Sequence, residues 1–189
     1  MNISPSEAEE ALAAIQAMVQ KTRRAISSSG AYLFLIVWGV IWLLGFLGSQ
    51  FLRSDLGGYA WMVLDTLGGI ISAALGIRMG RGVRRSSPGI SGKRIAIFWL
   101  LLFLFCIATV AISFPADGKQ NAMYIILFVM TGWVAMSMLL SFASVWPGLI
   151  ITALALIGYF LLPGIFYLWM AILGGGGMIA LGLYIRSRW

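Results

Sequence analysis

One acidic residue stands inside a long run of apolar residues. Asp65 lies in the segment 59–77, which holds no other charged residue and is long enough to cross a bilayer. A carboxylate at that depth is costly to insert, so it should face the interior of a helix bundle and find partners there. Such a group could hold a proton or a cation, or it could hydrogen-bond to neighbouring helices.

The residues expected at the depth of Asp65 are uncharged. They are Thr66 on the same segment, Cys106 and Thr109 on a segment over 95–114, and Thr131 on a segment over 122–140. Asp65, Thr66 and Thr131 are therefore the candidates for a proton- or cation-binding site in a small transporter. The alternative is structural: a largely protonated Asp65 would hydrogen-bond to adjacent helices and hold them together.

Other kinds of chemistry lack their residues. The chain has no histidine and a single cysteine, Cys106, so the commonest general base, the commonest metal ligand and any intrachain disulfide are excluded. No glycine-rich phosphate loop ending in Lys-Ser or Lys-Thr occurs. A two-aspartate protease would need a second intramembrane acid. We therefore expect no enzyme activity, no metal ion and no cofactor.

The composition is that of a membrane protein. Of the 189 residues 61% are hydrophobic and 10% charged, whereas ordinary soluble domains have about 25% charged residues. Six apolar runs approach the roughly 20 residues that a spanning helix needs. We expect an all-α fold with six transmembrane helices, at about 31–48, 59–77, 95–114, 122–140, 145–162 and 165–185.

The cations indicate how these helices are oriented. With the N-terminus inside, eleven of the thirteen lysines and arginines fall on the inner side, and Arg53 and Lys119 fall outside. Because cytoplasmic loops are enriched in such residues, both termini should be cytoplasmic. The bacterial cytoplasmic membrane is the expected location.

The segment 78–94 holds six cations and no acid. It is expected to be a solvated cytoplasmic loop. Alternatively it contacts anionic lipid headgroups or a protein partner, with nucleic acid not expected because the loop lacks aromatic residues for stacking. The candidate contact residues are Arg81, Arg84, Arg85, Lys93 and Arg94.

Residues 1–29 form the one segment of soluble character, ahead of a membrane domain over 30–189. Ser4, Pro5 and Glu7 are typical of a helix start, and the residues that follow predict an amphipathic cytoplasmic helix. It could pack on the protein itself, lie on the membrane surface, or dock a cytoplasmic partner or a second copy through residues 5–26.

The chain also contains an internal repeat. The segments Tyr59–Arg78 and Tyr167–Arg186 share nine of twenty residues without a gap, and Asp65 matches Leu173 in the second copy. Both copies run from outside to inside, so the repeat is parallel and relates the first hairpin to the third. Convergence of glycine-rich, aromatic-flanked helices is the alternative explanation.

Glycine is frequent, with 23 residues, and small residues allow membrane helices to approach closely. The double glycines of the repeat, Gly68, Gly69, Gly176 and Gly177, are the predicted helix-packing positions. The eight tryptophans and six tyrosines mostly lie near span ends, as interfacial belts do.

Two functions remain open. The first is a non-catalytic membrane component or regulator that contacts a cytoplasmic partner or anionic lipid through its N-terminal helix and basic loop. The second is a small proton- or cation-coupled transporter or channel that uses Asp65.

The six-span arrangement is testable by cysteine labelling. In a chain whose Cys106 is replaced by serine, cysteines at Arg85 and Trp189 should react with a membrane-impermeant maleimide from the cytoplasmic side alone, and one at Lys119 from the outside alone. Reaction of the Arg85 and Trp189 positions from opposite sides would contradict this topology.

Overall fold

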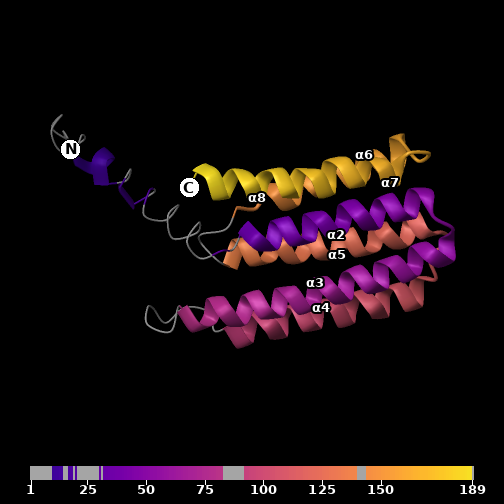
Figure 1. The fold of residues 1–189 in the computed structure, drawn as a ribbon, viewed down its shortest axis with the longest axis horizontal. Helices are drawn as coiled ribbons and strands as arrows, with labels where there is room; N and C mark the ends of the chain where they lie inside the picture. Colours follow the sequence, from indigo (N-terminus) through magenta and orange to yellow (C-terminus); the bar gives the residue numbers. More distant parts are fainter. Residues whose placement is uncertain are drawn as a thin grey trace.

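The computed structural model describes residues 10–14, 17, 18, 20, 30, 32–82, 92–139 and 144–188. Every regular element within these residues is helical, which confirms the all-α prediction. The elements, which run back and forth along one common direction (Figure 1), are α2 (Tyr32–Phe51), α3 (Ser54–Gly82), α4 (Gly92–Ser113), α5 (Gly118–Leu139), α6 (Trp146–Leu161), α7 (Phe166–Trp169), the π-helix η1 (Met170–Gly176) and α8 (Gly177–Arg188).

Among the described residues, five helical segments are long and apolar enough to cross a membrane. They lie in α2, α3, α4, α5 and the continuous stretch from α7 to α8. The remaining helix, α6, has 16 residues, or about 24 Å of length. A multi-pass membrane protein is thus supported, whereas the six-span count, the membrane's identity and the cytoplasmic orientation stay predictions.

The helix bounds differ from the predicted spans mainly in α3. This helix begins at Ser54 rather than near Tyr59, so Asp55 lies in its first turn and not in a loop. An acid in the first turn is favoured by the positive end of the helix dipole. The short connections elsewhere agree with expectation, and Pro147 lies in the first turn of α6.

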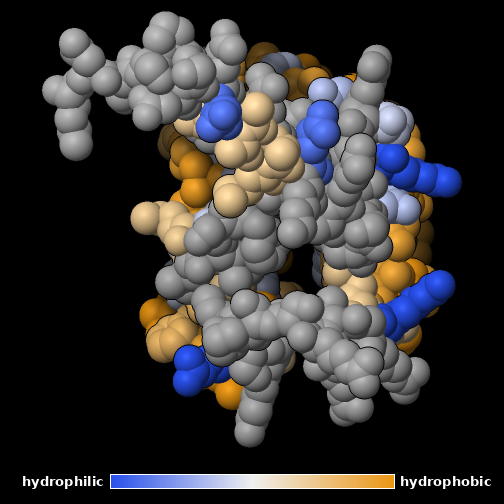
Figure 2. Space-filling view, turned by 90° about the vertical axis from the view of Figure 1, so that its left-hand side faces the viewer, coloured by the Kyte–Doolittle hydropathy of each residue, from blue (hydrophilic) through white to orange (hydrophobic). Residues whose placement is uncertain are grey.

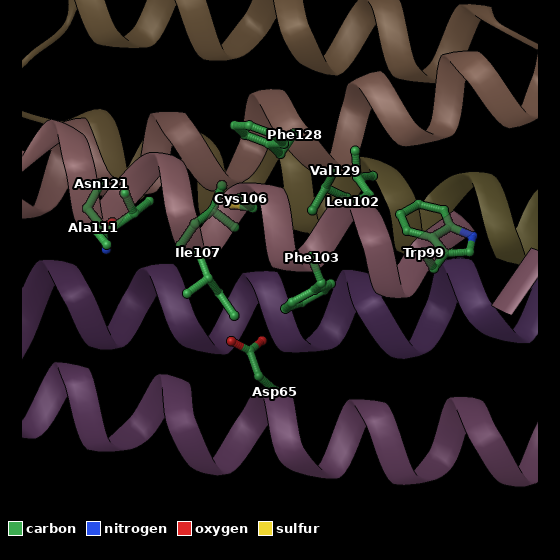
Figure 3. A pocket seen from close by; sticks show the side chains of 12 residues that line it. Asp65, Trp99, Leu102, Phe103, Cys106, Ile107, Ala111, Asn121, Phe128 and Val129 are labelled. Carbon is green, nitrogen blue, oxygen red and sulfur yellow. The ribbon is translucent and has the colours of Figure 1, made fainter. Parts of the chain in front are cut away.

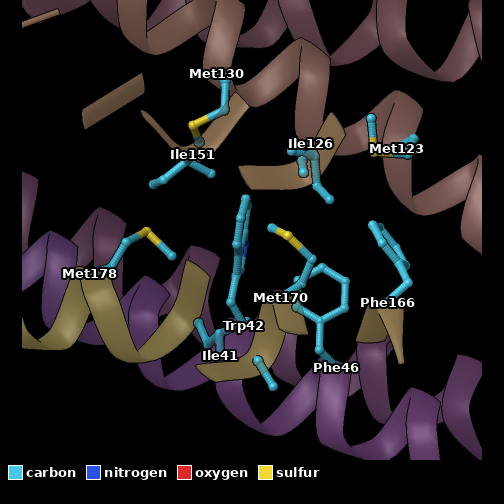
Figure 4. Packing of buried hydrophobic residues seen from close by; sticks show 12 residues of the cluster. Ile41, Trp42, Phe46, Met123, Ile126, Met130, Ile151, Phe166, Met170 and Met178 are labelled. Atoms are coloured by element: carbon cyan, nitrogen blue, oxygen red, sulfur yellow. The ribbon is translucent and has the colours of Figure 1, made fainter. Parts of the chain in front are cut away.

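The buried core comes from four of the six helical segments that run along the bundle (Figure 4). Its members lie on α2, α5, α6 and the α7–η1–α8 stretch: Ile41, Trp42, Phe46, Met123, Ile126, Met130, Ile151, Ala155, Phe166, Met170, Ala171 and Met178. None belongs to α3 or α4, although Trp61 and Leu64 of α3 pack against the cluster from outside. These four segments therefore form a central body, and α3 and α4 lie beside it.

Close backbone approach joins α2 to the last pass. A Cβ atom added at Gly175 would lie 2.5 Å from the Leu43 backbone nitrogen and 2.8 Å from the Gly39 carbonyl oxygen. One added at Gly182 would lie 3.1 Å from the Tyr32 carbonyl oxygen. The two backbones touch where glycine removes the side chain, which is how membrane helices gain contact that lipid cannot supply.

The predicted glycine contacts occur in part at neighbouring positions. Gly68 lies directly against Ile41 of α2. At Gly69 and Gly177 an added Cβ would meet no atom within 4 Å, and at Gly176 it would reach only Ala171 of its own helix. The gapless alignment of the two copies implies that both form the same α-helix. Residues 170–176 instead form a π-helix, which changes the direction in which side chains point from the helix. The close contact with α2 falls at Gly175, inside this π-helix.

Tryptophan rings cover glycines at several helix contacts. A Cβ added at Gly45 would lie 2.7 Å from the ring of Trp61, and one at Gly158 would lie 2.6 Å from that of Trp169. The sequence places these tryptophans in interfacial belts. In the structure they fill the space between helices. Trp61 and Trp169 are equivalent positions of the repeat, and both the repeat and the interfacial belts stay predictions.

The described cations lie at the two ends of the bundle. Arg78, Arg94 and Arg186 are exposed at the end where α2 begins and α8 finishes, and Arg53 and Lys119 lie at the other (Figure 1). Viewed from the first end, several hydrophilic side chains lie at the periphery, and apolar ones lie along the sides (Figure 2).

The contact between α2 and η1 gives a matched pair of stability variants. Gly175→Ala should lower the free energy of unfolding by about 1–3 kcal/mol, because the new methyl group collides with the backbone of α2. Gly177→Ala should leave it unchanged or slightly higher, since alanine is the better helix former. Thermal unfolding of both variants in the same detergent checks this, and equal losses would contradict the close contact at Gly175.

Candidate functional site

A cavity with a volume of about 380 Å³ lies between α3, α4 and α5. It contains the intramembrane acid singled out from the sequence (Figure 3). The lining residues are Asp65, Trp99, Leu102, Phe103, Cys106, Ile107, Val110, Ala111, Asn121, Ile125, Phe128 and Val129. Apart from Asp65 and Asn121, this lining is apolar or weakly polar.

The cavity exists because α3 and α4 attach to different helices. On one side, the indole nitrogens of Trp38 and Trp61 donate hydrogen bonds to Ser72 Oγ at 3.1 Å and Ser49 Oγ at 2.8 Å, which ties α3 to α2. On the other, a Cβ added at Gly132 of α5 would lie 2.9 Å from the ring of Trp99 of α4. Each flanking helix is held by its own neighbour, and the space between them is left open.

Asp65 is placed near the middle of its span. It follows Ser54, the first residue of α3, by eleven positions, or about 16 Å along the helix. Its side chain is exposed, and its carboxylate points from α3 toward Ile107 and Phe103 of α4 (Figure 3). The group therefore faces the open cavity and not a polar core.

No partner holds the carboxylate within the described part of the chain. The one ion pair found there joins Arg53 Nε to Asp55 Oδ1 at 3.6 Å, on the exposed surface. Asp65 makes no hydrogen bond and no ion pair with any described residue. A carboxylate without a donor in the middle of a candidate membrane span is unusual, because such residues normally find partners in the bundle.

The hydroxyl groups expected near Asp65 are engaged elsewhere. Thr66 Oγ1 donates to the Met62 carbonyl oxygen at 2.7 Å, and Thr109 Oγ1 donates to the Phe105 carbonyl oxygen at 2.8 Å. Since a hydroxyl has a single hydrogen to donate, neither can also donate to Asp65. Thr131 is exposed on α5 and, like Thr66, is absent from the cavity lining. Of the three predicted site residues, Asp65 alone lines the cavity, where Cys106 joins it.

Asn121 is a lining residue that sequence reasoning missed. Its Oδ1 atom is buried and has no hydrogen-bond partner. Asn121 lies in the first turn of α5, one residue before the span predicted at 122–140, so it was not among the residues expected at the depth of Asp65. The signal that could have found it is its position directly before a predicted span, where an extension of the helix by one turn includes it.

The predicted basic contact surface is described in small part. Arg94 is exposed in the first turn of α4. Arg81 and Lys93 lie in α3 and α4, but their side chains lie outside the description, as do Arg84 and Arg85 altogether. Of residues 1–29, those described are helical and exposed, including Leu12 and Met18, whereas Ser4, Pro5 and Glu7 lie outside the described residues.

Within the described ranges, no three histidine, cysteine, aspartate or glutamate residues gather into a group able to hold a metal ion. No protein-family model, curated protein or solved structure matches this chain. The function must therefore be inferred from the cavity itself.

The absence of a donor to Asp65 predicts the effect of its removal on stability. Asp65→Asn should leave the melting temperature in detergent unchanged or raise it, because an amide is less costly than a carboxylate in an apolar surrounding. Asp117→Ala is the comparison, since Asp117 Oδ1 accepts a hydrogen bond from the Gln120 backbone nitrogen at 2.7 Å. Loss of that N-cap should cost about 0.5–2 kcal/mol. A larger loss for Asp65→Asn would assign Asp65 a structural role.

Proposed function

We propose that the protein is a small proton-coupled membrane transporter in which Asp65 binds a proton and a cation in turn. The observation that supports this most directly is the carboxylate in the middle of a span, facing an open cavity and lacking a hydrogen-bond donor among the described residues.

The cost of the carboxylate is the first step of the argument. An acid near the bilayer centre opposes insertion by a few kcal/mol, so intramembrane acids mark ion and proton pathways or hydrogen-bonded contacts between helices. The hydroxyl groups of Thr66 and Thr109 donate to backbone carbonyls. The structural alternative requires a hydrogen bond between Asp65 and a neighbouring helix, and Asp65 makes none with a described residue.

Access is the second step. Asp65, Phe103 and Ile107 line the cavity and are exposed, so the carboxylate can be reached without unfolding the helix contacts. Because a single carboxylate holds either a proton or a cation, binding of one displaces the other. That exchange is the simplest means by which one acid couples two fluxes.

The alternative function, a component that contacts a cytoplasmic partner or anionic lipid, depends on the N-terminal helix and on the basic loop. Residues 83–91 and most of 1–29 lie outside the described residues, so that function stays a prediction with no contact in the structure that favours it.

Proton flux into proteoliposomes tests the proposal. With an outward gradient of tetraethylammonium and an internal pH-sensitive dye, wild-type protein should acidify the vesicles faster than protein-free liposomes, because each cation that leaves Asp65 is replaced by a proton. Asp65→Asn should reduce the flux to the protein-free level, because the proton site is gone. Asp55→Asn is the matched control on the same helix, outside the cavity, and should behave as wild type. Equal flux in the wild-type and Asp65→Asn vesicles would refute the proposed role.

A further inference from the structure

The cavity also indicates which cations it can take. We infer that its ligand is a lipophilic organic cation, which enters from the bilayer between α3 and α4 and pairs with Asp65. The inference rests on the proposed function insofar as Asp65 is the cation site, and it adds the chemical class of the ligand.

The number of oxygen atoms argues against a bare inorganic ion. A hard cation entering a protein exchanges its water shell for several oxygen ligands, six to eight for Ca²⁺. Among the described lining residues, Asp65 and Asn121 are the only ones with a side-chain oxygen. Two such residues cannot replace a hydration shell, whereas an organic cation carries its own apolar covering and needs only a counter-charge.

The lining of the cavity is chemically suited to a lipophilic cation. Trp99, Phe103 and Phe128 line the cavity together with aliphatic side chains, and Figure 3 shows Phe103 close to the Asp65 carboxylate. Aromatic faces attract cations, most strongly where water is excluded. Apolar walls with one opposite charge therefore complement a cation whose charge is shielded by hydrocarbon.

Size and access agree with this class. A volume of about 380 Å³ lies within the range of roughly 300–1,000 Å³ typical of sites for small organic ligands. Phe103 is 56% exposed and Ile107 61% exposed, so the cavity is open along α4. In a membrane this side faces lipid, where a lipophilic cation accumulates and a hydrated ion does not.

Asn121 supplies a second polar anchor. Its Oδ1 atom is buried and unpartnered, and a buried acceptor without a donor is costly. A ligand bearing an N–H or O–H group at the end away from its charge would satisfy this acceptor. Cations with such a donor should therefore bind better than those without one.

Binding of tetraphenylphosphonium to the purified full-length protein tests the inference. Tetraphenylborate has the same shape and the opposite charge, so it controls for hydrophobic partitioning into detergent and protein. Equilibrium dialysis should show saturable binding of the phosphonium and none of the borate. Asp65→Asn should weaken the phosphonium binding about tenfold or more, and Phe103→Leu about threefold.

Three further outcomes test the inference that the ligand is a lipophilic cation. Asp65→Glu, which keeps the charge, should retain binding, and loss in both Asp65 variants with normal melting temperatures would overturn the charge argument. Equal binding of the two ions would show a cavity that accepts any apolar molecule, such as a lipid tail. Proton flux that depends on Asp65 without phosphonium binding would overturn the inference and leave the proposed function standing.

Discussion

The arrangement of this protein depends on tryptophan rings seated on glycines of neighbouring helices. In a bilayer the hydrophobic effect does not distinguish a helix from a lipid tail, so contact area and hydrogen bonds hold helices together. A glycine has no side chain, so an indole ring opposite it can lie directly against the backbone of the neighbouring helix. The pairs of Trp61 with Gly45, Trp169 with Gly158 and Trp99 with Gly132 join three different pairs of passes. Two of these tryptophans also donate hydrogen bonds, to Ser49 Oγ and the Leu154 carbonyl oxygen.

This mode of attachment also explains the position of the cavity. The buried core is shared among α2, α5, α6 and the last pass, so those helices are fixed from several directions. In contrast, α3 rests mainly on α2, and α4 rests on α5. Among the glycines described in α3, none lies under an indole of α4, and the carboxylate of Asp65 lines the cavity between these two helices.

The helices and Asp65 were predictable because insertion into lipid imposes simple rules on length and polarity. The partners of Asp65 were not, because depth alone does not tell which way a side chain faces. Thr66 and Thr131 share its approximate depth but not its cavity, and Asn121 was missed at a helix end. The displaced glycine contact had another cause. Gly175 lies inside the π-helix Met170–Gly176, whose winding differs from the α-helix that a gapless repeat implies.

The length of α6 has a consequence for the surrounding bilayer. Its 16 residues reach about 24 Å, several ångströms less than a typical hydrocarbon core of about 30 Å. In the predicted six-span arrangement, lipids next to this helix would have to shorten, or the residues at its ends, such as the exposed Trp146, would have to extend into the headgroup layer. That arrangement would match the protein to thin membranes beside α6, and the acyl-chain length of the surrounding lipids would then affect its stability.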